Sequence, residues 1–90
     1  MPNYLVETFL PRGAADEREQ REGRARSAAE ETTRDGTRVH IEGSIHVPED
    51  EICFFRFAAA SAHVVERVAQ RAGLEPLRIV EAIASGKEIP

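Results

Sequence analysis

The chain has little cysteine, no long apolar run and no excess of positive charge. Its only cysteine is Cys53, so no disulfide can form within the chain. No stretch approaches the roughly 20 apolar residues that a transmembrane helix needs, and the first residues lack the basic segment of a secretory signal. With 12 Lys and Arg against 16 Asp and Glu, the net charge is −4, which gives no electrostatic footprint for nucleic acid. We therefore expect a cytoplasmic protein with neither membrane nor nucleic acid as a partner.

The sequence also lacks the short motifs that identify many enzymes. It has no glycine-rich phosphate loop, no nucleophile elbow and no Cys-x-x-Cys pair. Residues 1–90 make a single small domain, and so short a chain buries a smaller share of its surface than a larger one does. Oligomerisation is therefore a plausible way to complete its core.

Residues 38–47 alternate between apolar and polar types, which predicts a β-strand. The apolar face would carry Val39, Ile41, Gly43, Ile45 and Val47. The opposite face would carry Arg38, His40, Glu42, Ser44 and His46. Two of the three histidines and a carboxylate would thus share one face, which is where we expect any chemistry to lie.

Local patterns predict five further elements. These are strands over 3–9, 51–57 and 77–84 and helices over 14–34 and 61–72. Asp16 with Glu19 has the form of a capping box at the start of the first helix. Ser61 can cap the second helix, and Gly73 stands where a left-handed residue would end it.

The order β-α-β-β-α-β predicts a ferredoxin-like α+β fold, a four-stranded antiparallel sheet with both helices on one face. Beneath the helices we expect Tyr4, Val6, Val39, Ile41, Ile45, Val47, Cys53, Phe55, Phe57, Val80 and Ala82. The uncovered face would carry Leu5, Glu7, Phe9, His40, Glu42, Ser44, His46, Ile52, Phe54, Arg56, Ile79, Glu81 and Ile83. That mixture suits a face closed by a second subunit, as in a dimeric α+β barrel, with Phe54, Ile79 and Ile83 at the interface and a small cavity between the chains.

The pair His40 and Glu42 is the first candidate for a metal site. The two residues are i and i+2 on one strand face, so their Cβ atoms lie about 7 Å apart and both side chains could reach one ion at about 2 Å. Nitrogen and oxygen ligands suit Ni²⁺ or Zn²⁺, and a third ligand would come from Glu7, Glu81 or a partner chain. The alternative is a polar pair of an edge strand, in solvent or at a dimer seam.

The other polar residues have structural interpretations as well. His46 lies about 20 Å along the strand from His40, too far to share an ion within one chain, and His63 in the first turn of a helix is expected to be a neutral surface residue. Cys53 should behave as a small buried apolar residue. Ser44 and Arg56 would be polar members of the cavity. Glu7, Arg56 and Glu81 could also meet on the uncovered face as an ion pair, a ligand anchor or an acid/base pair.

Four stretches carry a resemblance that spans nearly the whole chain. They are YLVE at 4–7, GSIHVPEDEICF at 43–54, RAGL at 71–74 and RIVEA at 78–82. In them the chain resembles a family of small bacterial proteins, formerly a domain of unknown function, that includes an actinobacterial nickel-binding protein. The resemblance implies a ferredoxin-like homodimer and nickel as the cofactor, and Glu7 and Glu81 stand in the matching motifs.

Three classes of function stay open at this point. The first is a dimeric protein that binds a divalent metal, nickel first. The second is a dimeric α+β barrel enzyme that acts on a small, largely apolar organic molecule, with Glu7, Glu81 or His40 carrying protons. The third is a structural or interaction module whose uncovered face is used for dimerisation. The architecture hosts all three, so the fold does not choose among them.

Overall fold

The computed structural model describes residues 1–83 and has the predicted order of elements. The strands are β1 (Asn3–Phe9), β2 (Val39–Val47), β3 (Ile52–Ala59) and β4 (Arg78–Ala82), and the helices are α1 (Glu17–Arg34) and α2 (Ala62–Ala72). Two short 3₁₀ turns, Arg12–Ala14 and Pro48–Asp50, precede α1 and join β2 to β3. Residue 84, the last of the predicted strand over 77–84, lies outside the described residues.

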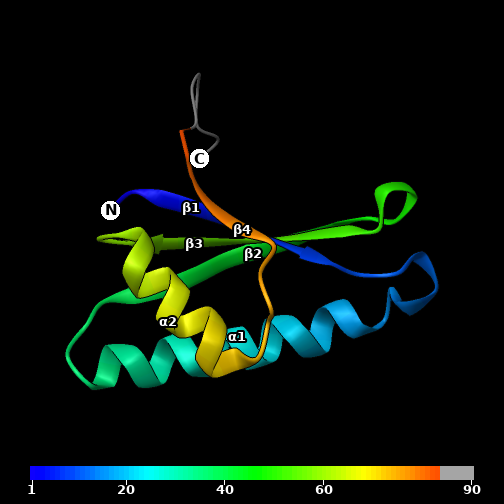
Figure 1. Cartoon of the computed structure of the whole chain (residues 1–90). Helices are drawn as coiled ribbons and strands as arrows, with labels where there is room; N and C mark the ends of the chain where they lie inside the picture. Colours follow the sequence, from blue (N-terminus) through cyan, green and yellow to red (C-terminus); the bar gives the residue numbers. More distant parts are fainter. Residues whose placement is uncertain (84–90) are drawn as a thin grey trace.

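The four strands form one antiparallel sheet in the order β2-β3-β1-β4. Both helices pack on one side of it, and the other side has no helix over it (Figure 1). This is the ferredoxin-like α+β arrangement that the element order predicts. Of the helices in the described part, none is long and apolar enough to cross a membrane.

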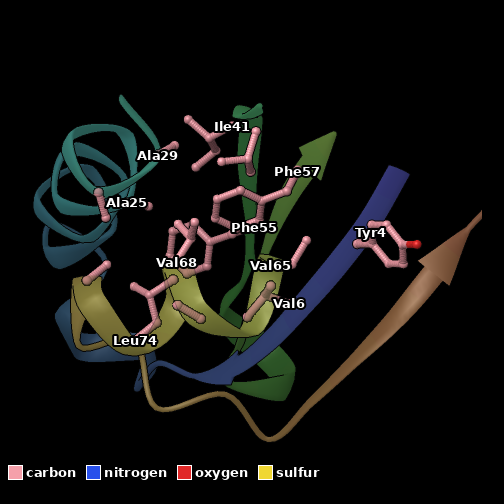
Figure 2. Packing of buried hydrophobic residues seen from close by; sticks show 14 of the residues in the cluster. Tyr4, Val6, Ala25, Ala29, Ile41, Phe55, Phe57, Val65, Val68 and Leu74 are labelled. Atoms are coloured by element: carbon pink, nitrogen blue, oxygen red, sulfur yellow. The ribbon is translucent and has the colours of Figure 1, made fainter. Parts of the chain in front are cut away.

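The core lies between the sheet and the two helices. The side chains of Val6, Cys53, Phe55 and Phe57 are fully buried there, and Figure 2 shows Phe55 and Phe57 pointing from the sheet toward the helices. From α2 the core receives Val64, Val65, Val68, Ala69 and Ala72, whereas from α1 it receives only Ala25, Ala28, Ala29 and Thr32. The valines fill the space above the sheet, and the alanines allow α1 to approach closely.

The ends of the two helices differ in how they are capped. Ser61 accepts a hydrogen bond from the backbone N–H of Val64, and Gly73, at φ 70°, ends α2 in the left-handed conformation, so both predicted caps are confirmed. The capping box predicted at Asp16 is wrong. Asp16 has a helical backbone conformation and its side chain makes no capping hydrogen bond, because the 3₁₀ turn already leads the chain into α1.

The strict alternation predicted for β2 is broken by a bulge. Register with β3 shifts between Ile41 and Gly43, so that Glu42 is an extra residue. Beyond the bulge the faces are exchanged: Ser44 and His46 pair with Phe55 and Cys53 on the covered face, and Ile45 and Val47 pair with Phe54 and Ile52 on the uncovered one. The predicted burial of Ile45 and Val47, and the exposure of Ser44 and His46 on the uncovered face, are therefore wrong.

The two faces of β4 are also the reverse of those predicted. Ile79 pairs with Val6 and Glu81 with Tyr4, both of which point toward the helices, and Ile79 packs against the core. Val80 and Ala82 pair with Leu5 and Asn3 and share the uncovered face. Ile79 is thus not available for the predicted dimer interface, and Ile83 follows the strand with 84% of its surface exposed.

Candidate functional site

A cluster of three charged or titratable side chains stands on the uncovered face near the bulge. His40 Nε2 lies 2.9 Å from Glu42 Oε2, and Arg56 Nη2 on β3 donates to Glu42 Oε1 at 3.1 Å. The bulge explains the meeting, because it leaves Glu42 without a residue opposite it and lets its carboxylate lie between the His40 imidazole and the Arg56 guanidinium. The predicted pairing of His40 with Glu42 is present, and Arg56 joins it.

Glu42 is held as a carboxylate at this position. The hydrogen bond from Arg56 lowers the pKa of Glu42 most, and His40 lowers it further, whereas partial burial acts in the opposite direction. An ionised carboxylate only accepts hydrogen bonds, so it selects the tautomer of His40 that carries its proton on Nε2. The Nδ1 atom of His40 then has a free lone pair, whereas a metal ion bound by both side chains would take the place of the Nε2 proton between His40 and Glu42.

The two other predicted metal ligands do not join this pair. Glu7 lies on the uncovered face, but its Oε1 accepts from Arg78 Nε at 2.8 Å. Glu81 lies on β4, at the opposite edge of the sheet from β2, and on the covered face. Within residues 1–83 no group of three or more His, Cys, Asp or Glu side chains could hold a metal ion.

The predicted meeting of Glu7, Arg56 and Glu81 is likewise not found. Arg56 pairs in register with Leu5 rather than Glu7, and its guanidinium reaches Glu42 across the β2–β3 ladder. Glu81 is excluded from the cluster by the reversed faces of β4. These charged groups of the uncovered face therefore form two separate sets, the His40–Glu42–Arg56 cluster on β2 and β3 and the Glu7–Arg78 pair on β1 and β4.

A small hollow lies beside the His40–Glu42–Arg56 cluster. It has a volume of about 210 Å³ and is lined by Leu5, Glu42, Gly43, Ser44, Ile45, Phe54 and Arg56. Around it the uncovered face is strongly apolar, with Ile45 64% exposed and Phe9 53% exposed. The face thus combines a carboxylate and a guanidinium with exposed apolar surface, and burying that surface against another molecule would be favourable because it releases water.

Ser44 takes part in a hydrogen-bond network on the covered side that the sequence analysis missed. Arg18 Nη1 donates to Ser44 Oγ at 2.9 Å, and the Ser44 hydroxyl donates to Glu22. Nearby, His46 Nε2 lies 3.2 Å from the carbonyl oxygen of Leu10. The signal that could have revealed this arrangement is Gly43, since a glycine inside a strand pattern is typical of a bulge.

The remaining candidates have the structural environments expected of them. His63 is exposed on α2, with its Nδ1 3.8 Å from Glu66 Oε1. Cys53 is completely buried, and that burial raises the pKa of its thiol, with Arg21 and Arg18 acting in the opposite direction. The predicted burial of Cys53 is confirmed.

These observations define the chain as a ferredoxin-like α+β protein with one uncovered, partly apolar sheet face. No family model matches the sequence, and no curated protein matches it. Among solved structures, the crystal structure of SCO4226 from Streptomyces coelicolor A3(2) is similar to this chain. The two share 24% sequence identity, and the match covers 93% of this chain and 99% of SCO4226 at a TM-score of 0.70. At this level of identity the similarity shows a shared fold.

Proposed function

We propose that the chain is a small cytoplasmic homodimer that binds a divalent metal ion, nickel first, at His40 and Glu42. The observation that carries the proposal is the distance of 2.9 Å between the His40 imidazole and the Glu42 carboxylate on a face that no helix covers. An imidazole nitrogen and a carboxylate oxygen are donors that Ni²⁺ and Zn²⁺ accept. Nickel is placed first because of the family that the sequence resembles.

Dimerisation would supply the donors that one chain lacks. Two protein ligands are too few for a stable site, and Glu7 and Glu81 do not complete it within the chain. A two-fold interface brings the same surface of each copy together, so a second His40–Glu42 pair would give two nitrogen and two oxygen donors. The exposed Ile45 and Phe9 give such an interface apolar area to bury.

Arg56 has a defined place in this proposal. It binds Glu42 Oε1, whereas His40 faces Oε2, so the guanidinium and a metal ion would use different oxygens of one carboxylate. By holding Glu42 ionised, Arg56 keeps the ligand ready for a cation. The positive charge of Arg56 also lowers the affinity of the site for a cation, so we expect a bound metal ion to exchange with solution.

Calorimetric titration with Ni²⁺, Zn²⁺ and Cu²⁺ tests the proposal. His40→Ala and Glu42→Ala should each weaken Ni²⁺ binding by at least about tenfold, or 1.4 kcal/mol. His63→Ala is the matched control, because His63 also faces a glutamate on the same chain, at 3.8 Å, and should leave the affinity unchanged. Affinity should fall below about pH 6.5, where a free imidazole takes up a proton.

Two results would overturn the assignment. If His40→Ala and Glu42→Ala bind Ni²⁺ like the wild type, the site lies elsewhere, with His46 and His63 the next residues to test. If the wild type binds no metal more tightly than about 1 mM, a free energy of only about −4 kcal/mol, the chain is not a metal-binding protein.

The hollow of about 210 Å³ supports a second candidate. Closed by a partner chain, it would become a cavity with Phe54 as an apolar wall and the Glu42–Arg56 pair as a polar anchor. Such a cavity suits an enzyme that acts on a small apolar organic molecule, with His40 as the proton carrier through its free Nδ1. If the chain dimerises but neither binds metal nor turns over such compounds, the third class of function, a structural or interaction module, is favoured.

A further inference from the structure

A groove of about 390 Å³ lies between the C-terminal half of α1 and the beginning of β2. Its floor is formed by Ala29 of α1 and by Val39 and Ile41 of β2, and Figure 2 shows Ala29 beside Ile41. All three floor residues belong to the core cluster and are almost completely buried, so the groove lies at the edge of the core and its base is apolar. The volume falls within the range of about 300–1,000 Å³ typical of small-molecule sites.

The walls of the groove are held together by hydrogen bonds. The Thr33 hydroxyl donates to the carbonyl oxygen of Val39 at 2.9 Å, and the N–H of Val39 donates back to Thr33 Oγ1 at 3.2 Å. These two bonds join α1 directly to the edge strand at the groove. The groove is therefore largely preformed, which reduces the entropy lost when a ligand binds.

The rim of the groove is positively charged although the chain as a whole is negative. Arg26, Arg34 and Arg38 line it together with one acid, Glu30, giving a local charge of +2 against −4 for the chain, with His40 taken as neutral. Arg26 is paired with Glu22 at 2.7 Å. Within residues 1–83, Arg34 and Arg38 have no ion-pair partner.

We propose that this groove binds a small amphipathic anion, with a carboxylate or phosphate head group and a short apolar tail. The head group is held by the guanidinium groups of Arg34 and Arg38, which match the geometry of both anions. The tail lies against Ala29, Val39 and Ile41, where its own apolar surface is removed from water. The groove shares His40 with the proposed metal site, but the residues that would hold the head group and the tail do not include Glu42.

Titration with octanoate and octyl phosphate, followed by calorimetry and by amide NMR shifts, tests the proposal. At least one anion should bind and shift the amides of Ala29, Val39 and Ile41, and the tighter of the two identifies the head group. Octylamine has the same tail and the opposite charge, so it should bind at least about tenfold more weakly. Raising the salt concentration should weaken binding of the anion, because both arginines are exposed.

The double variant Arg34→Gln and Arg38→Gln should weaken binding of the anion by at least about tenfold. Both side chains are exposed, so the variant should fold, which its circular dichroism spectrum checks. Arg38→Gln alone is compared with Arg67→Gln, an exposed arginine of α2 that does not line the groove and whose loss should have no effect. Glu42→Ala should retain binding of the anion whether or not it binds metal, which separates this site from the proposed metal site.

Several results would overturn the proposal. These are no binding of either anion below about 10 mM, equal binding of octylamine, unchanged affinity in the double variant, or amide shifts confined to another part of the molecule. An effect of Arg67→Gln as large as that of Arg38→Gln would also overturn it, because attraction by overall charge would then explain the binding.

Discussion

The two faces of the sheet use similar residues for different purposes. On the covered face Val6, Phe55 and Phe57 are fully buried, whereas on the uncovered face Phe9 and Ile45 are more than half exposed. The uncovered face also carries the His40–Glu42 and Glu7–Arg78 pairs. The comparison teaches that the covered face determines the stability of the folded chain, whereas the uncovered face keeps apolar surface that a second molecule could cover.

The largest expected effect concerns access to the covered face. Cys53 should react with a thiol reagent at least about a thousandfold more slowly than a cysteine introduced by Ala60→Cys, because labelling Cys53 requires an unfolding free energy of about 5 kcal/mol or more. Ala60 is exposed just after β3 and reports the rate of an accessible thiol. The reference protein carries Ala60→Cys together with Cys53→Ser, so that its only thiol is at position 60. The rate of labelling of each protein is followed by mass spectrometry. Rapid labelling of folded wild-type protein would contradict the sealed core.

Truncation of neighbouring phenylalanines compares the faces directly. Phe55→Ala should lower the free energy of unfolding by about 3–5 kcal/mol, since it leaves a cavity in a fully packed core. Phe54→Ala, one residue away on the uncovered face, should lower it much less at protein concentrations where the chain is monomeric. Urea unfolding monitored by circular dichroism measures both. Equal losses would mean that the uncovered face also stabilises the single chain.

A charge on the uncovered face should break the proposed dimer. Phe54→Glu would bury a carboxylate without a partner, a penalty on the order of 3 kcal/mol, and should convert a dimer at micromolar concentration into a monomer by light scattering. Gln70→Glu adds the same charge on the exposed side of α2 and should leave the mass unchanged. A wild-type monomer at micromolar concentration would show that the face is not a dimer interface.

The smallest effect is expected from the ion pairs of the uncovered face. Because Arg56 and His40 lower the pKa of Glu42, the carboxylate stabilises the folded state above the pKa that glutamate has in the unfolded chain, about 4.3. This stabilisation is lost as the pH falls through the lower pKa of the folded state. Glu42→Gln should therefore reduce the free energy of unfolding at pH 7 by less than about 1 kcal/mol, with no difference from wild type in strong acid. A difference that grows on acidification would contradict this sign.

Where the sequence predicted the structure well, the pattern was local and unambiguous. In α2 the valines repeat at helical spacing between a serine cap and a terminal glycine, and each of these features acts within one or two turns. In β3 the buried residues Cys53, Phe55 and Phe57 stand at every second position, and the hairpin to β2 is fixed by Pro48–Asp50. These features predicted the fold class and most of the core.

Where the prediction was wrong, the deciding contacts were not local. In β2 a single extra residue exchanges the faces of everything after it, and the apolar pattern continues through the bulge without a break. In β4 both faces contain an isoleucine or a valine, so the pattern does not choose between them. A backbone hydrogen bond determines the orientation of β4. The N–H of Leu77 donates to the carbonyl oxygen of Glu7 at 2.7 Å, which fixes the register of β4 on β1 and places Ile79 against the core. The predicted metal set assumed that Glu7 and Glu81 share the uncovered face with His40 and Glu42. Because Glu81 lies on the covered face and Glu7 pairs with Arg78, the four do not meet within residues 1–83.

The bulge at Glu42 has a further consequence, for solubility. β2 is an edge strand of nine residues, and an exposed edge can template addition of a strand from another molecule, which leads to aggregation. The bulge interrupts the regular spacing of backbone groups along this edge, and Thr33 already occupies both backbone groups of Val39. Growth of the sheet from copy to copy along β2, one of the two edges of the sheet, is thereby disfavoured.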